Sequence, residues 1–161
     1  MANLKVTIRE ELTLNGYDQG ATNTLTISGI NELSKRIVTA TTTEAGLLGF
    51  LSALSSVGVT ANKVGYLAGI LDDGDVRYIR ITNLDGSNHI TLTFRDEDNT
   101  EYRMKVDAGH SFIYPGDNSG GLVDTMKAAG SALSSGLADL VDITVAADTA
   151  SCDVEVYVAS V

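Results

Sequence analysis

The sequence predicts an all-β protein, and we expect a two-sheet, jelly-roll-like antiparallel β-sandwich with one or two short helices in its loops. Thr, Val and Ile are plentiful, while Pro occurs once and Trp is absent. β-branched residues suit a pleated, half-buried sheet surface. Several stretches alternate apolar and polar residues with the two-residue period of a strand. Turn residues separate these stretches at intervals of roughly ten residues, which is typical of sandwiches and barrels.

The N-terminal region predicts two strands separated by a turn. Leu4 to Arg9 alternates strictly, Glu10-Glu11 breaks the phase, and Leu12 to Leu14 resumes it. Such a break indicates a β-bulge. Asn15-Gly16 is a strong turn signal. Asn23 to Ser28 then alternates again and predicts the next strand.

The following region contains one strand and one ambiguous segment. Ile30 to Ala40 has a strand-like second half that runs into the Thr-rich stretch at residues 41–43. In Glu44 to Val57, four leucines recur at helical spacing, but Gly46 and Gly49 each disfavour a helix by about 1 kcal/mol relative to Ala. A short helix and an irregular loop over the core both remain open there.

The middle of the chain predicts a meander of four short strands. We expect the first two to pair with each other across the turn at Asp85 to Asn88, whose residues suit a hairpin. The four predicted strands are Val76–Leu84, Ile90–Phe94, Tyr102–Val106 and Ser111–Tyr114.

The C-terminal third combines a Gly-rich stretch with two closing strands. Gly116 to Gly136 predicts either a long functional loop or a second short helix around Thr125 to Leu133. Ala138 to Ala146 and Val154 to Val158 return to strand patterns. The 161 residues therefore predict about eight strands in a single β-sandwich domain spanning residues 1–161.

The charge disfavours two classes of partner. The formal net charge is −10, from 21 acidic and 11 basic residues, and a negative surface repels nucleic acid and anionic membranes. No apolar run is long enough to span a membrane, and no signal peptide is visible, so we expect a protein made and used in solution. A loose set of basic residues is interpreted as solvated strand faces and cross-strand ion pairs: Arg77, Arg80, Arg95, Arg103 and Lys105.

The sequence offers little that indicates catalysis. Cys152 is the only cysteine, and we expect it to be a small buried apolar residue. His89 and His110 each begin a predicted strand, where a partly exposed edge residue is the simplest interpretation. Gly116–Gly121 is Gly-rich but lacks the helix and the Lys-Ser or Lys-Thr pair of a phosphate loop. We therefore expect no enzyme, no catalytic residues and no cofactor.

Two acidic segments have two possible interpretations. Asp72–Asp75 and Asp96–Asn99 cluster the oxygen ligands that calcium prefers, although their spacing does not match an EF-hand loop. Asp and Asn also shape turns by bonding their own backbone. We expect structural turns and no metal site, and a divalent cation site is the alternative.

Strand and turn patterns over about half of the chain resemble small virion structural proteins of tailed bacteriophages. The resemblance rests on Val76–Asp85, then Ile90–Phe94, then Ala108–Phe112, and Ser34–Thr43 has the same general pattern. It implies capsid decoration (cement) subunits or components of head fibres or tails. Such subunits often form trimers over local symmetry axes of the shell.

We therefore expect a capsid decoration subunit on the virion exterior, made in the host cytoplasm. Its expected partners are the major capsid protein and two further copies in a homotrimer, with no nucleic acid and no membrane. The alternative is a tail or head-fibre component that binds host surface glycans, and a small hydrolase is a third hypothesis. Ala2 to Leu14 is the first candidate contact, as an edge strand that adds to a neighbour or as an ordinary core strand. Gly116–Gly136 and Gly46–Val57 are the next candidates.

Overall fold

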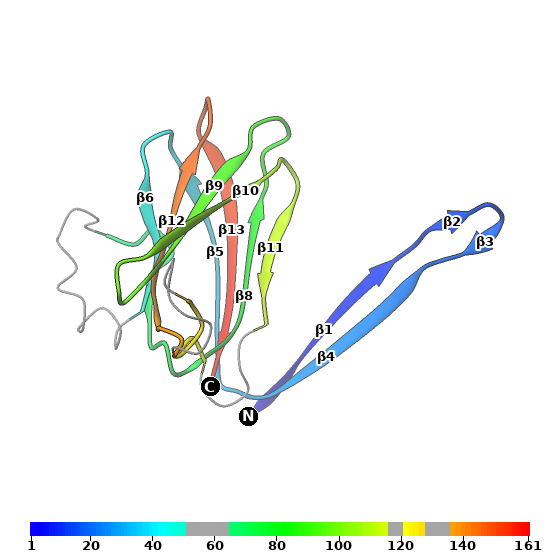
Figure 1. The fold of residues 1–161 in the computed structure, drawn as a ribbon, viewed down its shortest axis with the longest axis horizontal. Helices are drawn as coiled ribbons and strands as arrows, with labels where there is room; N and C mark the ends of the chain where they lie inside the picture. The colour runs from blue at the N-terminus through cyan, green and yellow to red at the C-terminus, as the bar shows by residue number, and fades with distance from the viewer. Residues whose placement is uncertain (51–64, 116–120, 128–135) are drawn as a thin grey trace.

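The computed structural model describes residues 1–50, 65–115, 121–127 and 136–161. It is a sandwich of two β-sheets from which a long hairpin projects (Figure 1). The described residues contain no helix, and the predicted all-β sandwich is confirmed. The strands are β1 (Ala2–Glu10), β2 (Thr13–Leu14), β3 (Tyr17–Asp18), β4 (Ala21–Ile30), β5 (Glu32–Ala40), β6 (Ala45–Phe50), β7 (Ile70–Leu71), β8 (Val76–Asn83), β9 (Ile90–Asp96), β10 (Glu101–Val106), β11 (Ser111–Tyr114), β12 (Leu140–Ala147) and β13 (Cys152–Ser160).

Two sheets form the sandwich. The five-stranded sheet has the order β10-β9-β12-β6-β7, and the four-stranded sheet has the order β11-β8-β13-β5. Their pairings are antiparallel except for β6 with β7, which is parallel. The projecting hairpin is formed by β1 with β4, and it is extended by the short pair β2 with β3. We call residues 2–30 the arm.

The core lies between the two sheets, where alternate side chains of both point inward. Leu92 and Ile143 from the five-stranded sheet and Ile79 and Val156 from the four-stranded sheet are buried. Each fully buried aliphatic side chain of this size stabilises the fold by about 1.5–3 kcal/mol. The alternation read from the sequence therefore located most strands correctly.

The pairing predicted for the meander is wrong. β8 pairs with β13 and β11 in the four-stranded sheet, while β9 pairs with β10 and β12 in the five-stranded sheet. The turn between them crosses from one sheet to the other. Asp85 shapes it by accepting hydrogen bonds from the backbone N–H groups of Ser87 (2.7 Å) and Asn88 (2.6 Å). The same turn residues serve a hairpin and a crossover, so turn chemistry alone could not tell them apart.

The ambiguous segment Glu44–Val57 begins as a strand rather than as a helix or an irregular loop. Ala45–Phe50 forms β6, and the rest of the segment lies outside the described residues. The ring of Tyr66 lies flat on this strand. A Cβ atom would come within 2.5 Å of that ring at Gly49 and within 2.8 Å at Gly46. The two glycines that argued against a helix are thus the positions that admit an aromatic ring.

The Gly-rich segment Gly116–Gly136 is described only over residues 121–127 and at Gly136. The backbones of Met126 and Ala138 exchange two hydrogen bonds, at 2.9 and 2.6 Å, and form an isolated bridge. The helix predicted to begin near Thr125 is therefore wrong over its described start, and residues 128–135 lie outside the description.

Candidate interaction surface

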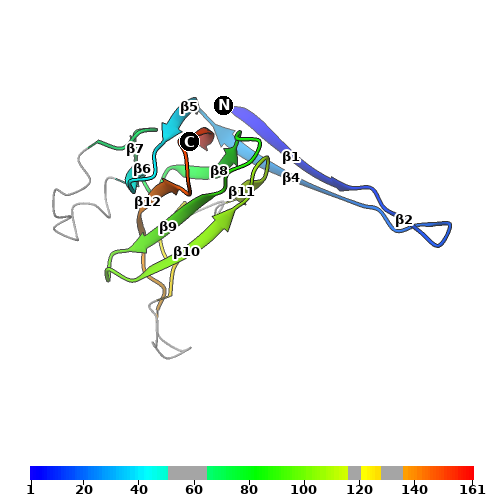
Figure 2. The same ribbon diagram turned by 90° about the horizontal axis from the view of Figure 1, so that it is seen from above.

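The arm leaves the sandwich as a long two-stranded ribbon (Figures 1 and 2). β1 and β4 pair antiparallel from Ala2↔Ile30 to Glu10↔Ala21. Beyond a break at the predicted bulge, β2 and β3 continue the ribbon with the pair Leu14↔Tyr17. Asn15 and Gly16 close it with φ of 53° and 81°, the two positive values that a type I′ hairpin turn requires. The predicted turn is confirmed.

The base of the arm is anchored on the outer face of the four-stranded sheet. Ile27 and Ile30 are buried there with Tyr78 and Ala159, in a hydrophobic cluster separate from the main core. Tyr157 adds an edge-on contact to Tyr78, with ring centroids 5.9 Å apart. We call this group the base cluster. It fixes the direction in which the arm leaves the sandwich.

The arm has one apolar and one polar side over β1 and β4. Because partners in the register share a face, Val6 lies opposite Leu25 on one side, and Thr7 lies opposite Thr24 on the other. The two threonine hydroxyl groups are 3.3 Å apart. The apolar side begins in the base cluster and continues outward to Ile8, which is 45% exposed. An amphipathic ribbon that extends beyond the core of the sandwich indicates a surface that binds another molecule.

The end of the arm, residues 9–22, carries both apolar and acidic groups. We call it the arm tip. Leu12 and Leu14 are half exposed, and Tyr17 is 72% exposed. A hollow of about 590 Å³ lies beside Leu12, and its charged lining residues are Arg9, Glu10, Glu11 and Asp18. Arg9 binds Glu11 at 2.6 Å. Three carboxylates therefore lie near one cation, and the arm tip has an excess of negative charge.

The outer face of the four-stranded sheet carries charges of both signs. Lys35 and Arg80 both bind the carboxylate of Glu155, at 3.0 and 2.6 Å. The hydrogen bond and charge of Lys35, followed by the charge of Arg80, lower the pKa of Glu155. Asp153, which accepts a hydrogen bond from Thr39 at 2.9 Å, adds a second carboxylate to the same face, so two cations face two carboxylates there.

β5 exposes two of its apolar residues to solvent on this same face. Leu33 and Ile37 are 59% and 61% exposed, and Lys35 lies between them. Ser34 and Arg36 instead occupy the core-side register, opposite Val158 and Val156. The first part of this strand therefore turns apolar residues outward, whereas Val38 and Ala40 further along it pack against the main core. Among the described strands β5 pairs only with β13, so it also forms an edge of the sheet.

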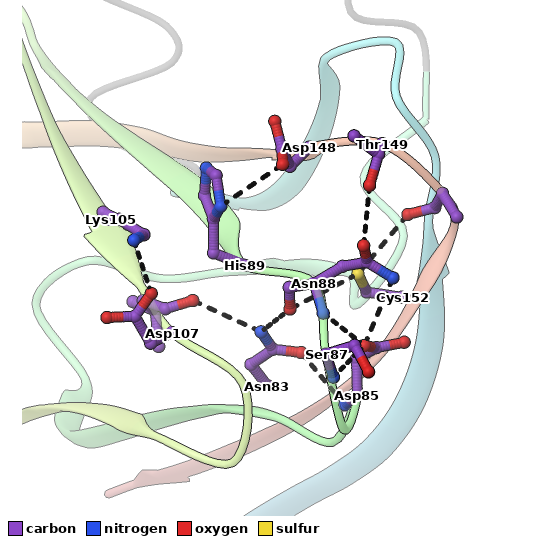
Figure 3. Close-up of polar contacts among 12 residues, drawn as sticks. Asn83, Asp85, Ser87, Asn88, His89, Lys105, Asp107, Asp148, Thr149 and Cys152 are labelled. Atoms are coloured by element: carbon purple, nitrogen blue, oxygen red, sulfur yellow. Dashed lines mark hydrogen bonds and ion pairs between the residues drawn. The ribbon is translucent and has the colours of Figure 1, made fainter.

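The candidate catalytic residues lie at one end of the sandwich, around the turn between β8 and β9 (Figure 3). Cys152 is buried as predicted, and burial, with smaller contributions from nearby aspartates, raises the pKa of its thiol. Its Sγ lies 3.9 Å from the carbonyl oxygen of Asn88 and 3.5 Å from that of Ala150. A buried thiol among carbonyl oxygens has no group here that would stabilise the thiolate.

The two histidines make separate local contacts. The Nδ1 atom of His89 lies 3.6 Å from a carboxylate oxygen of Asp148 (Figure 3). The Nδ1 atom of His110 lies 2.9 Å from the carbonyl oxygen of Ala108. Neither contact brings an imidazole to the sulfur of Cys152, so these three candidates share a region without forming a nucleophile and base.

The remaining polar groups of this end hold its loops together. Asn83 is buried and donates to the carbonyl oxygens of Asn88 (2.8 Å) and Val106 (3.2 Å). Thr149 donates to the side-chain oxygen of Asn88 at 2.6 Å. Hydrogen bonds from Asn88 and Ser87 lower the pKa of Asp85. We infer that this hydrogen-bond network, drawn in Figure 3, stabilises the turn that crosses between the two sheets.

The acidic turns bond their own backbone. The N–H of Gly74 donates to Asp72 (3.0 Å) and Asp73 (2.7 Å), and the N–H of Thr100 donates to Asp96 (2.6 Å). These bonds agree with the structural interpretation of both segments. Within the described ranges, no group of three or more His, Cys, Asp or Glu side chains could hold a metal ion.

The five basic residues singled out in the sequence are distributed over several strands and engage nearby oxygens. Arg95 pairs with the buried Asp142 across β9 and β12, and Lys105 binds Asp107 at 2.6 Å. Arg103 lies 3.6 Å from Glu101. The Arg80 and Arg95 contacts are the predicted cross-strand ion pairs, whereas Arg103 and Lys105 pair with acidic residues on or next to their own strand. The prediction is wrong for Arg77, which is buried and donates to the carbonyl oxygen of Gly74 at 2.5 Å.

Comparison of the chain with protein-family models, with curated proteins and with solved structures gave no match. The resemblance to phage virion proteins therefore stays a prediction. In the part of the chain that the structure describes, no helix is long and apolar enough to cross a membrane.

Ala2–Leu14, the first of the predicted contact segments, lies on a projecting element, while large parts of the other two segments are outside the described residues. The sequence analysis did not single out the outward face of β5 or Tyr17. A signal for Tyr17 existed, because Leu14 and Tyr17 flank the Asn-Gly turn as a cross-strand pair. Leu33, Lys35 and Ile37 alternate with polar residues, but that pattern alone does not say which side faces the core.

Proposed function

We propose that this chain is a structural subunit of a phage-type virion, a capsid decoration protein that binds the major capsid protein from outside. The observation that carries the proposal is the arm: an ordered ribbon that projects from the sandwich and exposes Leu12, Leu14 and Tyr17 at its tip. A two-stranded ribbon is marginally stable in water by itself. A ribbon with exposed apolar ends therefore suits a subunit that works by contacting its neighbours.

The charge of the chain and the narrowness of the arm agree with this role. A net charge of −10 does no harm on the outside of a shell, where the subunit meets water rather than packaged DNA. Each contact made by a narrow arm is small, but many copies on one shell act together, so modest contacts give a large combined resistance to internal pressure.

The test compares how the intact chain and a variant with a short arm bind to capsid shells that lack this protein. In the short-arm variant, residues 8–23 are replaced by the two residues Asn-Gly. This turn connects Thr7 to its register partner Thr24, and the base cluster is kept. We expect the intact chain to sediment with shells made of the major capsid protein and to raise their resistance to heating. Mass spectrometry of purified virions should give a copy number comparable to that of the capsid protein.

A chain that fails to bind such shells, or that occurs in only a few copies per virion, would contradict the decoration proposal. The few-copy result would favour the tail or head-fibre alternative, for which a glycan array is the direct test. Clustered, solvent-facing aromatic rings would support glycan binding. Among the described residues the two most exposed tyrosines, Tyr17 and Tyr102, lie instead on different elements, β3 and β10.

A further inference from the structure

We propose that two copies of this chain join through β5. The β5 strands pair antiparallel across a two-fold axis, so that the two four-stranded sheets become one continuous sheet of eight strands. The contact uses the backbone at the edge of the sheet and leaves the arm tip free for the capsid contact of the proposed function. It does not depend on which particle carries the chain.

β5 presents an unpaired row of backbone hydrogen-bonding groups. Leu84 donates its N–H to the carbonyl oxygen of Asp153 at 2.8 Å, and the register continues this pairing, so odd-numbered residues of β13 bond to β8. Because bonding direction alternates along an antiparallel strand, even-numbered residues of β13 bond to even-numbered residues of β5. The odd-numbered residues of β5 therefore direct their N–H and C=O groups to the free edge: Leu33, Lys35, Ile37 and Thr39.

This edge lacks most of the features that protect exposed strands from pairing. The nine residues of β5 pair with β13 without a register shift, so no bulge bends the strand, and it contains no proline. No other described strand pairs with its free side. Lys35 is the one charged residue among the four at the edge, and Ile37 beside it is 61% exposed. A long, regular and partly apolar edge pairs readily with another strand.

A second copy of β5 is the occupant because the strand fits itself in one register. A two-fold pair centred on Lys35 or Arg36 would set like charges directly opposite each other, which is destabilising. A pair centred on Ser34 or Val38 would cover only residues 32–36 or 36–40 of the strand. A pair centred on Ile37 covers residues 34–40, sets the two exposed isoleucines side by side and opposes no like charges.

The charges on the outer face agree with this register. Lys35 lies opposite Thr39 of the second copy, and Thr39 donates to Asp153 on the neighbouring strand at 2.9 Å. Each Lys35 therefore approaches the Asp153 carboxylate of the other copy, and the two-fold axis repeats this contact. Glu155, which Lys35 binds within one chain, keeps Arg80 as a partner. Unlike charges that meet across the contact favour this register over those that oppose two cations.

The two-fold contact places both arms on the same face of the joined sheet, because the axis of an antiparallel pair is perpendicular to the sheet. The arm begins in the groove beside Leu33 and Tyr157 and passes Ile113 and Pro115 at the β11 edge (Figures 1 and 2). It therefore leaves the sheet away from β5, and the two arms point in opposite directions. One dimer would bring two arm tips to one shell, and this consequence alone rests on the proposed function.

The first test is the mass of the full-length chain, measured by light scattering over a range of concentrations. We expect a dimer with twice the 16.9 kDa of one chain. The variant I37P loses a backbone N–H that only the second copy would use, and edge strands tolerate such a proline. The variant I37K keeps the backbone and sets two ammonium groups against each other at the two-fold axis. We expect both variants to keep the β spectrum of the intact chain and to have a mass of 16.9 kDa.

L33S and R36P are the matched controls. Leu33 lies on the same side of β5 as Ile37 and has nearly the same exposure (59% against 61%), but in this register it falls beyond the paired residues. L33S should therefore keep the dimer. The N–H of Arg36 bonds to β13, so R36P should lower the unfolding midpoint of the chain more than I37P does.

A disulfide cross-link tests the register itself. Arg36 of one copy and Val38 of the other would form a non-hydrogen-bonded pair, in which the Cα atoms are about 4.5 Å apart and within reach of a disulfide. R36C and V38C should therefore form a covalent dimer with oxidised glutathione only when the two variants are mixed. The native Cys152 is buried and should not contribute.

Several results would overturn the proposal. An intact chain that stays at 16.9 kDa at every concentration, even if it binds capsid shells, would reject the contact between copies and leave the proposed function standing. A mass of three subunits would exclude a single two-fold contact. A dimer that survives in folded I37P and I37K would place the contact elsewhere, and a cross-link in R36C alone would show a different register. A dimer that behaves as expected but does not bind shells would support this inference and contradict the proposed function.

Discussion

Replacing Ile27 with alanine is expected to release the arm while leaving the sandwich folded. Ile27 is 1% exposed and packs in the base cluster, which contains no residue of the main core. Truncating a buried isoleucine to alanine costs about 2–5 kcal/mol. Because a free hairpin is marginal in water, a loss of this size falls on the docking of the arm.

Hydrogen exchange measures this effect segment by segment. At about 1.4 kcal/mol per factor of ten, a loss of 2 kcal/mol raises the exchange rate of protected arm amides by about 30-fold. We expect this increase in peptides from β1 and β4, and little change in peptides from β9 and β12. L25A is the matched control, because Leu25 lies on the same side of β4 but is 36% exposed.

The reasoning would be refuted if exchange in β9 and β12 rose as much as exchange in β1 and β4. That result would mean that the arm and the sandwich unfold as one cooperative unit. Equal effects of I27A and L25A on the arm would refute it in a different way, because they would show that the base cluster does not hold the arm.

Four further predictions concern the sandwich. G49A should lower the free energy of unfolding by about 1–3 kcal/mol in chemical denaturation, because its Cβ would lie 2.5 Å from the ring of Tyr66. Burial, and then Asp142, raise the pKa of Tyr66 to about 12. The neutral phenol is therefore favoured in the folded state, so its stabilisation is complete below a pH of about 10 and is lost as the pH rises toward 12. Denaturation at several alkaline pH values should show a steeper fall for the intact chain than for Y66F. The lowered pKa of Glu155 acts in the opposite range: its stabilisation should be lost as the pH falls below about 4.3, and E155Q should flatten this acid-side slope. Cys152, buried and with a raised pKa, should react with iodoacetamide only after unfolding, as mass spectrometry of native and denatured samples would show.

The sequence located strands better than it located their partners. Strict alternation in β8 and β9 shows that each strand has one buried side, but it says nothing about which sheet the strand joins. β8 and β9 both have core-facing side chains. These side chains are buried equally well whether the turn between the strands forms a hairpin or crosses from one sheet to the other. Only the long-range pairs, β8 with β13 and β9 with β12, decide the topology.

β6 was missed because it lacks the strand period. Leu47, Leu48 and Phe50 are all buried, since one side of the strand faces the core and the ring of Tyr66 covers glycines on the strand. A strand covered on both sides loses its alternation and is easily mistaken for a short helix segment. The ring that explains the pattern comes from a distant part of the chain, which local analysis cannot see.

The candidate interaction surface was predicted only in part. Ala2–Leu14 was expected to be either a contact strand or an ordinary core strand, and the second interpretation is wrong because most of the segment is exposed. The projection itself could not be predicted, because the residues that clamp it, Tyr78 and Ala159, lie far away in the sequence. The role of the segment as a contact stays a prediction.

The outward apolar residues of β5 and the arm tip are not needed by the sandwich, and this is the strongest reason to seek a partner for them. Leu33, Ile37, Leu14 and Tyr17 lie outside both hydrophobic clusters. Four such side chains contribute at most about 6–12 kcal/mol when fully buried. Association itself costs roughly 4–15 kcal/mol, so a single contact made by these side chains is weak. A shell lattice, in which each copy makes several contacts at once, converts the same small surface into a stable assembly.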